Sequence, residues 1–132
     1  VVVGIDSLRD ADGRWRVRSH TGDPDKTRQL GVLSLDWLQE AQSRGAGEIV
    51  LNCMASDGTR DGYDIEQLTA ARAVCDVPLI ASGGAGSVRH FIDVFQACDV
   101  DGALAASVFH KNILPVPALK RELAQHGIPV RL

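Results

Sequence analysis

Leu79-Ile80-Ala81-Ser82-Gly83-Gly84-Ala85-Gly86-Ser87 is the stretch around which the fold is best predicted. Its apolar residues indicate a buried strand, its glycines a turn that no side chain crowds, and Ser87 the start of a helix. Such a turn directs several backbone N–H groups toward one point, where the positive end of the helix dipole also acts. This pattern can bind a phosphate without a lysine, although glycines after a strand also occur as ordinary turns.

Two further segments support the phosphate-binding interpretation. Ala103-Leu104-Ala105-Ala106-Ser107 predicts a second buried strand that ends at a hydroxyl group. Asp57-Gly58-Thr59 follows an earlier apolar strand. Polar residues that follow buried strands are typical of ligand sites in α/β proteins.

The composition indicates an ordinary globular protein of one domain, residues 1–132, with 45% hydrophobic and 23% charged residues. A net charge of -3 gives no electrostatic case for nucleic acid or an anionic membrane as a partner. No apolar run is long enough to cross a bilayer, and the N-terminus lacks the features of a signal peptide. Because the chain opens on a core strand, we expect residues to be missing before Val1.

The cysteines favour a reducing compartment. Cys53, Cys75 and Cys98 are odd in number and widely spaced, which suits buried thiols better than a disulfide framework or a zinc site. No metal-ligand or dinucleotide-binding pattern is visible. We therefore expect a cytoplasmic protein without a metal or other cofactor.

Strands and helices alternate along the chain. Apolar runs predict strands at residues 1–5, 48–53, 77–81 and 102–106. Amphipathic periodicity predicts helices at residues 35–44, 64–74, 88–98 and 115–126, with Ser34 and Asp64 as N-caps and Gln67 at the capping-box position. Asp6 is expected to end the first strand, residues 14–18 to form a small hairpin, and residues 23–33 to form a loop.

Strands that alternate with helices predict a parallel sheet covered by helices, in the α/β class. The sheet could be small and open, or it could be a (βα)4 half of a TIM (β/α)8 barrel. Polar residues fall at the C-terminal strand ends: Asp6, Asn52, Asp57, Ser82-Gly83-Gly84 and Ser107. On a barrel they would meet on the rim where such folds do their chemistry, and this favours the half-barrel.

Several segments, in this order, resemble one enzyme family. They are Val3-Gly4-Ile5-Asp6, Arg44-Gly45-Ala46-Gly47-Glu48-Ile49, Asp57-Gly58-Thr59 with Gly62-Tyr63-Asp64, Ile80-Ala81-Ser82-Gly83-Gly84-Ala85-Gly86 and Ala103-Leu104-Ala105-Ala106-Ser107-Val108-Phe109-His110. Together they resemble the C-terminal half of the cyclase subunit of imidazole glycerol phosphate synthase, from histidine biosynthesis. The resemblance spans essentially the whole chain, as strands five to eight of the full barrel.

The resemblance implies a lyase reaction that needs no cofactor. Ammonia from a glutaminase partner attacks a ribulosyl aminoimidazole carboxamide nucleotide (PRFAR), which yields imidazole glycerol phosphate and AICAR. Asp6 matches one of the family's two catalytic aspartates and would act in general acid/base catalysis. The second aspartate and the other phosphate site belong to the N-terminal half-barrel, which this chain lacks.

The resemblance also assigns binding residues. Gly83, Gly84 and Ser107 would form a phosphate site, and Asp57 and Gly58 a substrate-binding loop. Thr21 and Gly22 would line the substrate pocket. Glu48, at the opposite end of its strand, would belong to a charged ring through which ammonia enters the barrel.

Two alternatives stay open from the residues. One is the related isomerase of the same pathway, which performs an aldose–ketose rearrangement on the same fold; the segment from Arg44 to Glu48 and the long hairpin after Asp6 favour the cyclase. The other is a non-catalytic half-barrel module that self-associates through its open strand edges, as a homo-oligomer.

Overall fold

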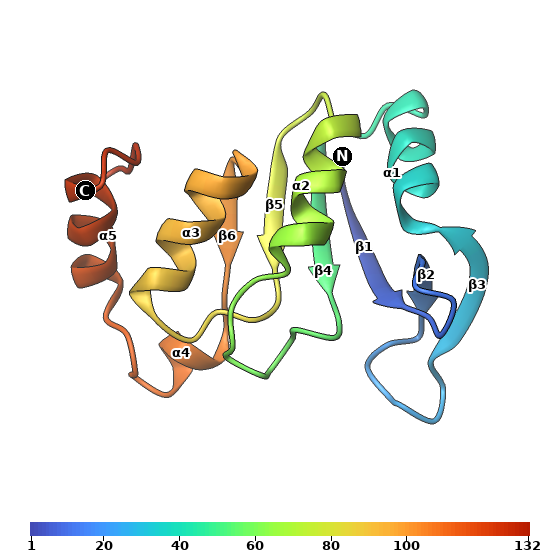
Figure 1. The fold of residues 1–132 in the computed structure, drawn as a ribbon, viewed down its shortest axis with the longest axis horizontal. Coiled ribbons are helices and arrows are strands. Elements are labelled where there is room, and N and C mark those ends of the chain that lie inside the picture. The colour runs from blue at the N-terminus through green and yellow to red at the C-terminus, as the bar shows by residue number, and fades with distance from the viewer.

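A six-stranded sheet runs through the molecule in the order β3-β2-β1-β4-β5-β6. The computed structural model describes residues 1–132. The strands are β1 Val2–Arg9, β2 Trp15–Ser19, β3 Arg28–Leu33, β4 Glu48–Cys53, β5 Leu79–Ser82 and β6 Gly102–Leu104. The helices are α1 Ser34–Ser43, α2 Ile65–Val74, α3 Val88–Cys98, α4 Ser107–His110 and α5 Val116–Gln125 (Figure 1).

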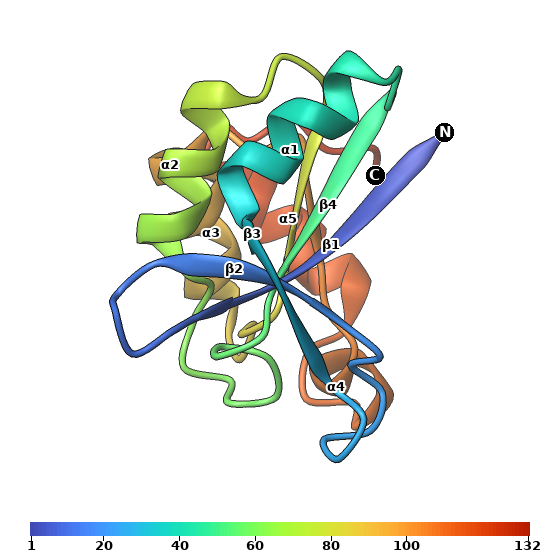
Figure 2. The same cartoon turned by 90° about the vertical axis from the view of Figure 1, so that its right-hand side faces the viewer.

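The strands β1, β4, β5 and β6 are parallel to one another, as the alternation of strands and helices predicted. Helices α1, α2 and α3 lie on one side of this sheet, which Figure 2 shows nearly edge-on. This is the α/β arrangement of a half TIM barrel, in which helices cover the outer face only. The predicted fold class is confirmed.

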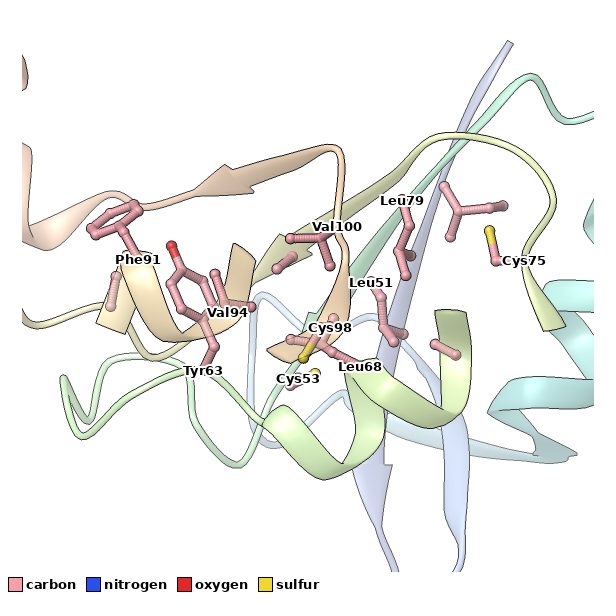
Figure 3. Close-up of a cluster of buried hydrophobic side chains, with 14 of the residues drawn as sticks. Leu51, Cys53, Tyr63, Leu68, Cys75, Leu79, Phe91, Val94, Cys98 and Val100 are labelled. Carbon is pink, nitrogen blue, oxygen red and sulfur yellow. The ribbon is translucent and has the colours of Figure 1, made fainter. Parts of the chain in front are cut away.

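A single apolar core fills the space between the sheet and the helices. Ile49 and Leu51 of β4, Leu68 of α2 and Leu79 of β5 are fully buried there. Figure 3 shows Leu68 close to the thiols of Cys53 and Cys98. The three cysteines are free and buried, and burial raises the pKa of the Cys53 thiol well above its ordinary value. The buried thiols therefore belong to the packing of the core.

The opposite face of the sheet is apolar and uncovered. Val2 of β1 is 56% exposed and Leu104 of β6 is 49% exposed, and Val50 and Ile80 between them are partly exposed. Continuous apolar strands predict burial on both faces, and here only one face is covered. The first half of β1 also has no partner strand on the side away from β4, because β2 pairs only with Asp6–Arg9.

The region after Asp6 differs from the prediction. Asp6 does not end β1, which continues to Arg9 and pairs with β2 in an antiparallel hairpin. Residues 23–33 are not all loop, because Arg28–Leu33 forms β3, antiparallel to β2. Both corrections have one cause: β3 is largely exposed, so no burial pattern marks it, and its pairing with β2 alone makes it a strand.

Two of the three predicted helix starts behave as expected only in part. Ser34 is the first residue of α1 and not its cap, since its hydroxyl lies 2.6 Å from the Ser7 hydroxyl inside the core. Asp64 does cap α2 by accepting from the Gln67 N–H at 3.0 Å. The Gln67 side chain, however, donates to Ser7 and does not return to the cap. Buried hydroxyls compete for these side chains, because unpaired polar groups in a core are costly.

The hairpin is held by an ion cluster around Asp10. The Asp10 carboxylate accepts hydrogen bonds from Arg16, Arg18 and Gln29. The Arg18 side chain is only 8% exposed, so Arg16 and Arg18 do not form the solvated face that their alternation indicates. Partial burial raises the pKa of Asp10, but hydrogen bonds from both arginines outweigh it and hold this pKa below its usual range.

The lowered pKa of Asp10 predicts acid-sensitive stability. The contribution of the carboxylate is fully present above its unfolded-state pKa of about 4 and is lost as the pH falls through the lower folded-state pKa. Asp10→Asn is therefore expected to reduce the free energy of unfolding near neutral pH and to have little effect near pH 3. Urea unfolding at both pH values checks this, with the exposed Asp76→Asn as control. An Asp10→Asn effect of equal size at both pH values would contradict it.

No helix in the structure has both the length and the apolar character needed to span a membrane.

Candidate active site

The loops after β4, β5 and β6 surround a small pocket of about 110 Å³. The wall of this pocket includes residues predicted from the sequence: Asp57, Gly58, Gly83, Gly84 and Ser107. Ser82, Ala85 and residues 104–106 complete the wall. The turn after β5 and the hydroxyl after β6, which are far apart in the sequence, thus share one concave site, and this is the size and place expected for a small anion.

The glycines of this turn allow two loops to touch. Gly84 has φ of 112°, and a Cβ built there would lie 1.9 Å from the Gly62 carbonyl oxygen. At Gly86 a Cβ would lie 2.1 Å from the Arg60 carbonyl oxygen. The Gly62 N–H donates to the Gly84 carbonyl at 2.8 Å. These glycines are therefore required for the close approach of the β4–α2 loop as well as for the shape of the turn.

Tyr63 connects the same loop to β6. Its hydroxyl donates to the Leu104 carbonyl at 3.0 Å, and its ring packs edge-on against Phe91 with centroids 5.6 Å apart. Burial raises the pKa of Tyr63, so the hydroxyl keeps its proton. The tyrosine therefore holds the end of β6, and with it the start of the Ser107 turn, against the β4–α2 loop.

Tyr63→Phe is expected to lower the free energy of unfolding by about 1–2 kcal/mol, because the Leu104 carbonyl loses its donor while the ring contacts remain. Urea unfolding followed by circular dichroism measures the change. An equal stability of the two proteins would show that water replaces the hydroxyl without loss.

Asp6 lies in a row of polar side chains that crosses three strands. Sheet register places Asp6, Asn52 and Ser82 side by side, on the uncovered face. Asn52 donates to Asp6 Oδ1 at 2.9 Å and accepts from the Ser82 hydroxyl at 3.3 Å. Thr21 donates to the other oxygen, Asp6 Oδ2. Both carboxylate oxygens of Asp6 are thus hydrogen-bonded, and the row leads from Asp6 to the pocket wall at Ser82.

Asn52 and Ser82 were noted from the sequence only as polar strand ends and had no assigned role. Their signal is positional, since each is the polar residue at the end of its apolar strand, as Asp6 is on β1. Only the register between strands shows that they share one row with Asp6. Gly22, by contrast, is exposed next to Thr21, and a Cβ there would meet nothing within 4 Å.

Glu48 lies at the other end of β4. It opposes Val2 in the register and points to the same face as Asn52, because side chains on a strand alternate. With four residues between the two positions, they are about 13 Å apart along the strand. The structure therefore places Glu48 away from the pocket and on the same open face as Asp6.

A comparison with known protein families decides the family. The sequence profile described as "Histidine biosynthesis protein" matches residues 1–115. The chain belongs to this family. The matched region contains every predicted site residue, from Asp6 to Ser107.

Individual relatives narrow the comparison to the cyclase subunit. The chain is 66% identical over 131 residues to "Imidazole glycerol phosphate synthase subunit HisF" of Xylella fastidiosa (strain M12). It is 65% identical to the same subunit of Xanthomonas euvesicatoria pv. vesicatoria and 64% identical to that of Xanthomonas campestris pv. campestris (strain B100). The predicted resemblance to this subunit is confirmed, and these relatives favour the cyclase over the isomerase.

The chain spans about half the length of these relatives. Each alignment covers 99% of this chain and 51% of the relative. A half-length relationship agrees with a sheet that has one uncovered apolar face and an unpaired segment of β1.

Proposed function

We propose that this chain contributes half of the active site of an imidazole glycerol phosphate synthase cyclase. Asp6 transfers protons, and a second carboxylate comes from an N-terminal half-barrel. The pocket formed by Asp57, Gly58, Gly83, Gly84 and Ser107 binds one phosphate of PRFAR. The observation that carries this proposal is that two sequence-distant turns meet in one pocket, joined to Asp6 by the Asn52–Ser82 row.

The reaction follows from these placements. A carboxylate at the end of a strand can accept and return a proton while ammonia attacks PRFAR and the product ring closes. Thr21 and Asn52 orient Asp6 by donating to its two oxygens. The products would be imidazole glycerol phosphate and AICAR, and neither a metal nor a redox cofactor takes part.

The uncovered face supplies the binding surface for the N-terminal half-barrel. Val2, Val50, Ile80 and Leu104 would become the interior of the closed barrel, and β1 and β6 would gain partner strands. Apolar surface of this kind is stabilised by burial. Residues 1–132 thus form one domain that is complete only in the assembled barrel.

The glutaminase partner would bind at the Glu48 end of the barrel. Glu48 is on the inner face and far from the pocket, so ammonia that enters there would travel along the barrel axis toward Asp6. We place this complex in the cytoplasm, where the three free thiols stay reduced.

The direct test is ammonia-dependent turnover of PRFAR. The chain alone is compared with the chain mixed with the N-terminal half of the Xylella fastidiosa relative, with assembly checked by mass. We expect turnover only in the mixture, and phosphate binding without turnover by the chain alone. An assembled mixture without turnover would contradict the proposal. A chain that forms stable homo-oligomers and never binds the N-terminal half would favour the self-associating module.

A further inference from the structure

His90 links the two loops that form the proposed phosphate pocket. It lies in the first turn of α3, and its Nδ1 accepts a hydrogen bond from the Gly86 N–H at 3.0 Å. A ring nitrogen that accepts carries no hydrogen, so the neutral ring has its proton on Nε2. The same ring lies against Gly62, where a Cβ would be 3.5 Å from His90 Cδ2.

The joint around His90 is otherwise made of backbone. Gly62 N–H donates to the Gly84 carbonyl, and the Arg60 carbonyl lies against Gly86. Ser87, the N-cap residue of α3, forms no side-chain cap hydrogen bond. The histidine therefore does what a capping side chain usually does at this helix start, but for the N–H one residue earlier.

This contact restrains the peptide group between Ala85 and Gly86. Ala85 belongs to the pocket wall, together with Gly83 and Gly84. If the Gly86 N–H lost its acceptor, this peptide group could rotate, and the neighbouring N–H groups that a phosphate would use could change direction. Three aligned N–H groups bind an anion well only when their orientation is set in advance.

We propose that His90 is a positioning residue of the pocket. Its Nδ1 fixes the Gly83–Gly86 turn, and its ring keeps the Asp57–Gly62 loop against that turn. The inference rests on the proposed phosphate site and deepens it, because it names a residue outside the pocket wall on which phosphate affinity depends.

Two variants separate the two contacts. His90→Phe keeps a ring against Gly62 but removes the acceptor. His90→Asn removes the ring but can place its Oδ1 where Nδ1 accepts from Gly86. His126→Asn is the matched control, because His126 is exposed at the end of α5.

Hydrogen exchange of the Gly86 and Gly62 amides tests the joint without a ligand. Titration of the ¹⁵N-labelled chain with inorganic phosphate, followed at Gly83, Gly84 and Gly86, tests binding. We expect His90→Phe to speed Gly86 exchange and to weaken phosphate binding by about fivefold, the factor for one lost hydrogen bond. His90→Asn and His126→Asn are expected to stay within about twofold of the parent chain.

The outcomes separate the two proposals. Phosphate affinity that is equal in the parent chain and His90→Phe would overturn the role of His90 and leave the phosphate site standing. Equal weakening by the Phe and Asn variants, with equally lowered unfolding midpoints, would overturn it too, since that result shows only a packing role. A parent chain whose glycine amides do not respond to phosphate overturns the phosphate site itself, and the exchange pattern then decides whether His90 joins the loops.

Discussion

Asp6→Asn is expected to reduce ammonia-dependent turnover of PRFAR by about 10²–10⁴-fold in the barrel assembled from this chain and an N-terminal half. Asparagine keeps the size of the side chain and can still accept from Thr21 and Asn52 through one oxygen. It cannot accept and return a proton. The loss should therefore fall on kcat, with phosphate affinity and assembly unchanged.

The design of this experiment isolates the proton-transfer role. Asp76→Asn is the control, because Asp76 is an exposed carboxylate before β5, far from the strand ends that carry the pocket. Asn52→Leu adds a second comparison, since it removes the donor to Asp6 Oδ1 and leaves the carboxylate in place. We expect Asn52→Leu to lower kcat by less than Asp6→Asn does. Full activity of the Asp6→Asn barrel would remove Asp6 from the mechanism.

Gly84→Ala is expected to lower the free energy of unfolding by about 3 kcal/mol or more. The methyl group would lie 1.9 Å from the Gly62 carbonyl oxygen, and φ of 112° is a conformation that alanine rarely adopts. The β4–α2 loop would have to move away, and Asp57 and Gly58 would leave the pocket with it. Urea unfolding measures the stability, and the phosphate titration at Gly83 and Gly86 measures the site.

Gly45→Ala is the matched control for Gly84→Ala. Gly45 follows α1 with φ of 94°, but a Cβ there would meet nothing within 4 Å. It should cost about 1–2 kcal/mol for the backbone conformation alone and leave phosphate binding unchanged. If both substitutions cost the same, the contact between the two loops has no energetic weight, and the account of Gly84 given by the structure is wrong.

The periodicity of the sequence was sufficient for the parallel part of the sheet and for its helices. Apolar runs such as 48–53 and the stripe of Phe91 and Ile92 reflect burial directly, because each strand or helix faces the same core throughout its length. The hairpin ribbon was predicted only in part. β3 has an exposed surface on both sides, so its existence depends on pairing with β2 and leaves no pattern in its own residues.

The sequence by itself determined which residues end the strands, and therefore which chemistry can gather on the rim: a carboxylate at residue 6, glycines at 83 and 84 and a hydroxyl at 107. It could not determine which of them touch. Register between β1, β4 and β5 placed Asn52 and Ser82 in one row with Asp6, and loop packing gave Gly84, Tyr63 and His90 their partners. A strand's own pattern records what is buried, whereas hydrogen bonds between strands and loops depend on three-dimensional neighbours that are distant in the chain.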